Sequence, residues 1–268
     1  ASELMSEAGR LLERDIHPLV IVKGYQLAMQ ITLDEIENRS KTVGDNLEKV
    51  SRTALVGRST EGAMSHLASL IAQSVNAIPD SDYERVRMSK AGEGTAATSE
   101  LIPGILIEKR LALERMPKNL LDIKVAVLSC PLELESSAVS SEIEISTPEQ
   151  YQAFIDEENN QIEKMIQKVK SSGAQAVFSA ESIDPRALHS LADSGIFAMG
   201  GLERPIAEDV AQACGAALCD HLDDLSNSLG HADGLTHERL EGPEGVKERL
   251  SIEVGKDAGI VTILVGGT

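Results

Sequence analysis

The residues of this chain that could do chemistry are few and scattered. Cys214, Cys219 and His221 lie close enough in sequence to suggest a site for a soft metal ion. Structural zinc sites, however, use four ligands with tighter cysteine spacing. Each cysteine also falls at the end of an expected helix or strand, where a thiol packs as a small apolar side chain. We therefore predict no metal site.

A glycine-rich stretch resembles a dinucleotide-binding loop in its pattern alone. Residues 92–97 match G-x-G-x-x-A, but that pattern binds a dinucleotide where it follows a buried strand and opens a helix. Residues 87–91 do not read as a buried strand. The phosphate-loop, H-E-x-x-H and G-x-S-x-G motifs do not occur in the sequence. We predict no catalytic residue, and we interpret the small, polar stretch 89–99 as a hinge or linker.

The charge and composition exclude several kinds of partner. The 268 residues include 25 Lys and Arg against 43 Asp and Glu, a formal net charge of −18 at pH 7. A chain this acidic is not expected to bind the phosphate backbone of a nucleic acid. Aromatic residues, at 2%, are also too few to stack on its bases. The apolar runs are too short to span a bilayer, and no signal peptide is visible. We expect a cytoplasmic protein that binds neither nucleic acid nor membrane.

The elements that position these residues change in character near residue 99. Before it, apolar residues recur at helical spacing. This predicts helices over 4–12, 18–40, 47–55 and 64–79. The first two are separated at Pro18, because the residue before a proline avoids helical geometry. After residue 99, short apolar runs or alternation predict strands at 105–107, 125–128 and 142–145.

Strands and helices alternate from residue 176 onward. The predicted order is a strand at 176–179, a helix at 185–192, a strand at 196–199, a helix at 206–214 and a strand at 216–219. This βαβαβ order is typical of a parallel sheet flanked by helices, so the fold class is α/β. The acidic residues 220–245 read as loops. The last predicted strands are at 251–254 and 260–265.

A long helix is predicted to begin at Thr147 and to end at Gly173. The polar run 156–160 in its middle supplies no apolar anchor, so the whole helix cannot be buried. It is either an ordinary surface helix or a protruding helix whose first part contacts a partner. The apolar patch near its start consists of Tyr151, Phe154 and Ile155.

Short motifs follow one another in a specific order along nearly the whole chain. They are Ile16-His17-Pro18, Ile21-Val22-Lys23-Gly24-Tyr25, Thr53-Ala54-Leu55-Val56-Gly57-Arg58, Ser99-Glu100-Leu101-Ile102, Met116-Pro117-Lys118, Ile145-Ser146-Thr147-Pro148, Gly173-Ala174-Gln175-Ala176-Val177-Phe178 and Val261-Thr262-Ile263-Leu264-Val265-Gly266-Gly267-Thr268. Each motif is weak alone. The ordered set is specific, and it resembles the group II chaperonins, the archaeal thermosome family.

The resemblance implies an architecture and a function. Residues 1–98 and 246–268 would form a discontinuous, mainly helical intermediate domain, with a remnant of the equatorial domain at about 1–20. Residues 99–245 would form an apical α/β domain with a lid protrusion at about 134–165. The expected function is that of a chaperonin subunit, which binds unfolded polypeptide and closes a built-in lid. Its other partners would be further subunits in a double ring.

The resemblance also implies what this chain does not contain. The family's G-D-G-T-T nucleotide loop would precede the first residue, and its catalytic Asp would follow the last. ATP and Mg would therefore belong to the full-length subunit, and we expect no cofactor and no ATP hydrolysis in this chain. The chain begins without Met, which favours a piece of a longer protein.

The candidate site residues follow from the matching positions. Arg58 replaces a lysine in the family's nucleotide-sensing loop, although a solvated loop cation is the alternative. Residues 199–205 lack the family's basic cluster, so we expect a less basic binding face. The sites are the sensing loop at Gly57 and Arg58, substrate contacts at Glu208, Asp209 and Gln212, and lid contacts at Tyr151, Phe154 and Ile155.

Two other functions stay open at this level. A small-molecule enzyme with an α/β domain is compatible with the βαβαβ order, but a fold alone does not assign a function. A natural, truncated chaperonin-like protein with a regulatory binding role is compatible with the same motifs.

Overall fold

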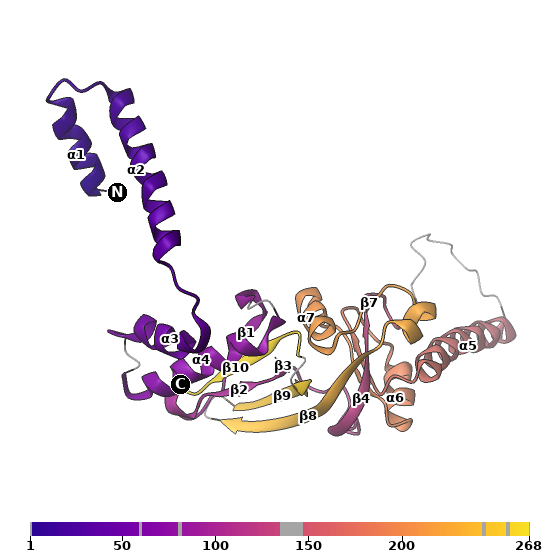
Figure 1. Cartoon of the computed structure of the whole chain (residues 1–268). Helices are drawn as coiled ribbons and strands as arrows, with labels where there is room; N and C mark the ends of the chain where they lie inside the picture. The colour runs from indigo at the N-terminus through magenta and orange to yellow at the C-terminus, as the bar shows by residue number, and fades with distance from the viewer. Residues whose placement is uncertain are drawn as a thin grey trace. The chain divides into compact units, whose positions relative to one another are not determined.

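The computed structural model describes residues 2–58, 61–79, 82–134, 147–242, 245–255 and 258–267. The chain divides into two compact units, Ala1–Leu47 and Glu48–Thr268, and each is described by itself (Figure 1). The expected strand at 142–145 and part of the expected lid at 134–165 lie outside the described residues.

The first unit contains the helices α1 (Ser2–Leu12) and α2 (Pro18–Arg39), as predicted. His17 caps α2, because its side chain accepts a hydrogen bond from the N–H of Leu19. The hydroxyl of Tyr25 donates to the carbonyl of Leu4 at 2.7 Å and joins the two helices. Within this unit, many apolar side chains of α2 are exposed, namely Leu19, Val20, Val22, Leu27, Met29, Ile31, Leu33 and Ile36.

The second unit begins with two predicted helices and a small sheet. The helices are α3 (Leu47–Leu55) and α4 (Met64–Ala77), and the strands are β1 (Val86–Lys90), β2 (Glu100–Ile102) and β10 (Val261–Val265). Strand β10 lies in the centre, parallel to β1 and antiparallel to β2. Helix α4 packs on β10 and β2. The sheet therefore joins a strand from the end of the chain to two strands that precede residue 103.

The stretch 89–99, predicted to be a hinge or linker, begins at the end of β1 and continues along the margin of this sheet. Its first two residues end β1, and Ala96–Thr98 form a 3-10 turn. The hydroxyl of the buried Ser99 accepts a hydrogen bond from the N–H of Gly266 at 3.1 Å. A Cβ on Gly266 would lie 2.2 Å from the carbonyl oxygen of Thr95. Small polar residues suit a tightly packed turn as well as a linker, and the hinge role stays a prediction.

A seven-stranded mixed sheet forms the larger core. Its strands are β3 (Gly104–Ile107), β4 (Asn119–Leu128), β5 (Ala176–Ser179), β6 (Phe197–Met199), β7 (Leu218–Cys219), β8 (Gly230–Gly242) and β9 (Gly245–Glu253). The order is β3-β9-β8-β4-β5-β6, with β7 also paired to β4. Strands β7, β4, β5 and β6 are parallel, which confirms the predicted βαβαβ order. The pairs β3–β9, β9–β8 and β8–β4 are antiparallel.

The prediction of loops over 220–245 is wrong, because it missed β8. This 13-residue strand pairs with both β4 and β9. Its alternation is hard to read, since the buried positions shift from Ala232 to Leu235 within the strand. The shift occurs at the level of Asp122 in β4, whose φ is 52°. The alternation of buried and exposed residues along β8 is interrupted at this level.

The large sheet also crosses an expected domain limit. The limit between residues 245 and 246 falls at the start of β9, which remains in this sheet to Glu253. The strand predicted at 251–254 is only the end of β9. The division into domains remains a prediction.

Three predicted helices flank the seven-stranded sheet: α5 (Pro148–Ser172), α6 (Pro185–Asp193) and α7 (Arg204–Cys214). The hydroxyl of Thr147 accepts the N–H of Gln150 at 3.3 Å at the start of α5, and Gly173, with a φ of 81°, ends it. Helix α5 packs on α6, and α7 packs on β3, β4 and β8. The mainly aliphatic core between them includes Phe178 and Phe197, whose ring centroids are 5.7 Å apart.

Candidate functional site

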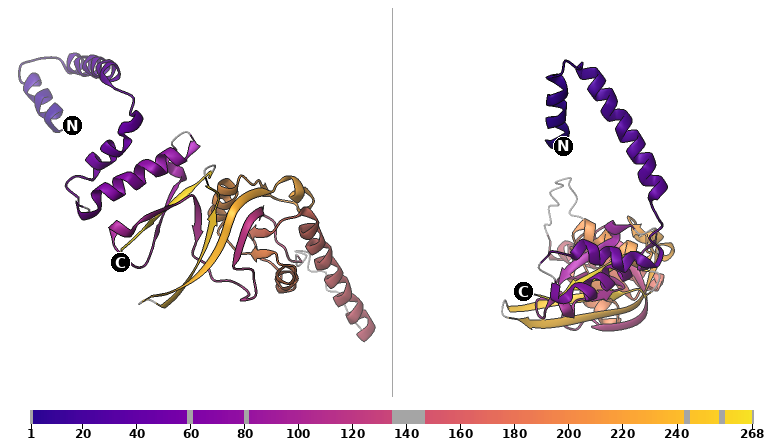
Figure 2. Two further views of the ribbon diagram at one scale, coloured as in Figure 1. Left: turned by 60° about the horizontal axis from the view of Figure 1, so that its bottom comes forward. Right: turned by 60° about the vertical axis from the view of Figure 1, so that its left-hand side comes forward.

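Helix α5 leaves the core part-way along its length. Near the end of α5, the apolar stripe of the helix is buried. Near the start, the same stripe carries Tyr151 and Phe154, whose exposed fractions are 56% and 40%. Ile155 beside them is half-buried. Figures 1 and 2 show the first turns of α5 extending beyond the sheet. The apolar patch predicted near the start of the helix is therefore accessible. The buried residues near its end are Ile162, Ile166 and Val169.

Arg186 at the start of α6 is hydrogen-bonded to α5 at the point where α5 leaves the core. Arg186 donates from Nη1 to Oδ1 of Asn159 at 2.8 Å, and it also binds both carboxylate oxygens of Asp184. Asp184 in turn caps α6 by accepting the N–H of Arg186 at 2.7 Å. The hydrogen bonds from Arg186 hold the pKa of Asp184 below its ordinary value. The apolar patch therefore lies in the part of α5 that precedes Asn159, where the helix is hydrogen-bonded to α6.

Helix α7 presents the three predicted substrate contacts in different ways. Glu208 and Gln212 are exposed, as predicted, and Glu208 pairs with Arg204 at 3.0 Å. Asp209, however, is only 16% exposed and forms an ion pair with Arg87. The prediction that Asp209 faces outward is wrong, because a strand from the other sheet covers it. The opposite face of the helix is buried at Ala207, Val210, Ala211, Ala213 and Cys214.

Arg87 is a residue that the sequence motifs do not include. It lies on β1 and donates from Nε and Nη2 to the two oxygens of Asp209 at 2.7 and 2.5 Å. Its Nη1 donates to the carbonyl of Glu84 at 2.9 Å. The hydrogen bonds to Asp209 raise the pKa of Arg87 above its ordinary value. The sequence carries no local signal for this pair, since its two residues are far apart along the chain.

The predicted nucleotide-sensing loop follows α3. Gly57 has a φ of 76°, a geometry that favours glycine. The exposed Arg58 donates from Nε to the carbonyl of Ala54 at 3.2 Å. Residues 59 and 60 lie outside the described residues. One exposed guanidinium can contact a phosphate, but it does not by itself hold a nucleotide. The sensing role remains a prediction.

The cysteines are free thiols. Cys214 and Cys219 are buried, as predicted for apolar packing. Burial raises the pKa of Cys214 to about 12, and the thiol of Cys219 donates to the carbonyl of His221 at 2.9 Å. Among the residues that the structure describes, no three His, Cys, Asp or Glu side chains are grouped so as to hold a metal ion. Within the same residues, every helix is too short or too polar to cross a bilayer.

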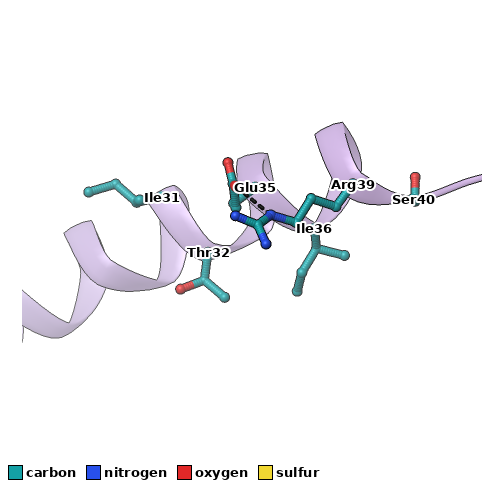
Figure 3. Close-up of a pocket in the computed structure, with 6 residues that line it drawn as sticks. All are labelled: Ile31, Thr32, Glu35, Ile36, Arg39 and Ser40. Carbon is teal, nitrogen blue, oxygen red and sulfur yellow. Dashed lines mark hydrogen bonds and ion pairs between the residues drawn. The ribbon is translucent and has the colours of Figure 1, made fainter.

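Each unit has a hollow on the surface of its described residues. A hollow of about 180 Å³ beside the β8–β9 hairpin is lined by Arg110, Arg239, Val246 and Glu248. A groove of about 580 Å³ follows the end of α2 and is lined by Ile31, Thr32, Glu35, Ile36, Arg39 and Ser40 (Figure 3). Neither set of described lining residues pairs a nucleophile with a general base through a hydrogen bond. All six residues that line the groove come from the end of α2 and the residue that follows it.

Comparison with known proteins decides the family. The model of the TCP-1/cpn60 chaperonin family matches residues 1–268. The chain belongs to this family. The predicted resemblance to chaperonins is confirmed.

Alignment with individual chaperonins shows what share of a subunit's length this chain covers. The chain is 33% identical over 281 residues to the thermosome subunit of Methanopyrus kandleri. It is 34% identical over 275 residues to thermosome subunit beta of Methanothermobacter thermautotrophicus. Each alignment covers 100% of this chain but only 51% or 50% of the relative. The chain therefore spans about half the length of these curated relatives.

A solved structure confirms the fold. The open-state monomer of a group II chaperonin from Methanococcoides burtonii has a TM-score of 0.68 to this chain at 23% sequence identity. The match covers 100% of this chain and 63% of that chain. The predicted mixed α/β fold class is confirmed.

Proposed function

We propose that this chain is the intermediate and apical part of an ATP-dependent group II chaperonin subunit. It binds unfolded polypeptide and closes a built-in lid over it. Membership of the chaperonin family supports this proposal, as do relatives that are thermosome subunits. The observation that carries the polypeptide-binding claim is the accessible patch of Tyr151, Phe154 and Ile155 on α5.

The patch has the chemistry that unfolded chains require. Unfolded polypeptides expose apolar side chains, and burial of apolar surface stabilises their complexes. Tyr151 and Phe154 offer large, sequence-tolerant contact area. Exposed Glu149 and Asp156 flank the patch, and the net charge of −18 keeps copies of the chain apart. The patch can thus face a client without causing self-association.

The proposed domains are those expected from the family. Residues 1–98 and 246–268 form the intermediate part, and residues 99–245 form the apical part with the lid at about 134–165. The parallel pairing of β1 with β10 supports an intermediate domain that is made from two chain segments. Strand β2, just after residue 98, pairs with β10 in the three-stranded sheet, and β9 keeps residues 246–253 in the seven-stranded sheet, so strands near both proposed limits pair across them.

The remaining activities belong to the full-length subunit. We propose that it supplies the ATP and Mg site, that it assembles with other subunits into a double ring, and that it acts in the cytoplasm. This chain alone does not hydrolyse ATP. Arg58 reports the state of the nucleotide to the intermediate part, which moves as a rigid body about short hinges. The exposed apolar side chains of α2 pack against further protein of the same subunit.

Removal of the two aromatic side chains tests the polypeptide-binding claim. Replacing Tyr151 and Phe154 together with serine is expected to weaken binding of an unfolded chain about tenfold or more, since each buries apolar area in the complex. The probe is labelled ribonuclease A, reduced and carboxamidomethylated so that it stays unfolded. Its fluorescence anisotropy reports binding.

A second variant controls for the number of substitutions. Gln161 and Gln167 are exposed polar residues on the same helix, and their replacement with serine is expected to leave the affinity unchanged. If the two double variants bind the probe equally well, the patch on α5 is not the polypeptide contact.

A further inference from the structure

Hydrogen bonds join helix α7 to β1 of the three-stranded sheet and to the residues just before β10, although its buried face packs on the seven-stranded sheet. The first point of attachment is the pair of hydrogen bonds, 2.7 and 2.5 Å long, from Arg87 of β1 to Asp209. The second point is a backbone contact, in which the N–H of Gly259 donates to the carbonyl of Ala213 at 3.4 Å. A Cβ on Gly259 would lie 2.0 Å from the carbonyl oxygen of Gln212.

The two points differ in how they can be undone. The contact at Gly259 is made by backbone atoms next to β10 and has no side chain that could rotate away. The contact at Arg87 is made by side chains alone, and the Arg87 side chain is 44% exposed. Bidentate geometry makes such a pair specific, while access of water on the arginine side makes it releasable. Helix α7 therefore has one attachment made by backbone atoms and one made by side chains that can separate.

We propose that the Arg87–Asp209 pair is a latch beside the exposed residues Glu208 and Gln212 of α7, which are predicted from the sequence to contact substrate. When closed, it fastens the helix to β1 and keeps the Asp209 carboxylate away from a client. When open, it leaves the helix attached at Gly259 and adds Asp209 to the exposed Glu208 and Gln212. A cationic side chain of the client is the group that competes for Asp209, because it can replace the guanidinium. The client's role here rests on the function proposed above.

Hydrogen exchange on the 268-residue chain tests the fastening. Arg87→Gln and Asp209→Asn are each expected to speed exchange of the amides in 86–90 and 204–214 about tenfold, since each removes the two charge-assisted hydrogen bonds of the pair. Arg87→Gln also removes the hydrogen bond to the carbonyl of Glu84. The double variant is expected to exchange no faster than Arg87→Gln, because that variant has already lost the pair. Arg204→Gln removes the 3.0 Å pair within α7 and is expected to leave exchange of 86–90 unchanged. Additive effects, or no effect of Asp209→Asn on 86–90, would overturn the latch.

Binding of a fluorescein-labelled oligolysine peptide tests the exposure of Asp209. Arg87→Gln is expected to bind the peptide about fivefold more tightly than the unaltered chain, and the gain is expected to vanish when Asp209→Asn is added. Arg115→Gln changes the net charge equally while removing a pair with Asp193, 2.9 Å apart. Equal affinities of the Arg87→Gln and Arg115→Gln variants would overturn the latch.

The two assays separate the latch from the proposed function. If exchange responds as expected but no variant binds either the peptide or unfolded ribonuclease A, the fastening of α7 stands and its role as a client contact fails. If unfolded ribonuclease A binds but exchange does not respond, the proposed function stands and the latch fails.

Discussion

Gly104→Ala is expected to lower the free energy of unfolding by about 3 kcal/mol or more. Gly104 begins β3 with a φ of 150°, a conformation that side chains rarely adopt. A Cβ there would lie 1.9 Å from the backbone carbonyl oxygen of Ile252 in β9. The carbonyl of Gly104 also accepts a buried hydrogen bond from Thr262 of β10 at 2.8 Å. The substitution therefore strains the point where the two sheets meet, and urea unfolding followed by circular dichroism measures its cost.

Gly173→Ala is the matched control for this experiment. Gly173 also has a positive φ, 81°, but a Cβ added there would meet no atom within 4 Å among the described residues. Its replacement is expected to cost about 1 kcal/mol, from backbone strain alone. Equal losses at the two positions would contradict the close approach of β3 to β9.

Phe178→Ala is expected to lower the free energy of unfolding by about 4 kcal/mol. Phe178 is 0% exposed on β5, which lies between β4 and β6, and its ring packs at 45° to that of Phe197. Truncation would leave a cavity between the helices and the sheet, and it would remove the contribution of the ring pair. The same urea unfolding experiment measures the loss.

Phe154→Ala is the matched control for Phe178→Ala, because it removes the same side chain from an exposed position. Phe154 is 40% exposed on the protruding part of α5, so we expect a loss of less than about 1 kcal/mol. A cost as large as that of Phe178→Ala would mean that the start of α5 is buried, and it would contradict the accessible patch.

The regular elements could be predicted from the sequence where one local pattern dominates. Helix α5 is an example, because its threonine cap, its apolar stripe and Gly173 all indicate the same bounds. Strand β8 could not be predicted, since its glycines, charged residues and shift of buried positions match no single period. Its stability comes from pairing with β4 and β9 on either side. Such non-local pairing leaves no pattern within the strand itself.

The candidate site shows the same division between local and distant causes. The exposure of Tyr151 and Phe154 follows from the polar run in the middle of α5, which is a local feature. The outward orientation of Glu208 and Gln212 follows from helical spacing. Helical spacing also predicts an outward orientation for Asp209, but Arg87, 122 residues earlier in the chain, binds and covers it. Helical spacing predicts which side chains leave the core, but it does not predict which of them another element then covers.

Aggregation of a denatured protein, followed in the presence of this chain and without ATP, tests the binding of unfolded polypeptide most directly. A client enzyme is diluted from guanidinium chloride, and light scattering follows its aggregation. We predict that the 268-residue chain slows the scattering and that the chain with Tyr151 and Phe154 replaced by serine does not. If the unaltered chain leaves aggregation unchanged while the apical domain of a thermosome slows it under the same conditions, the proposed binding of unfolded polypeptide is contradicted.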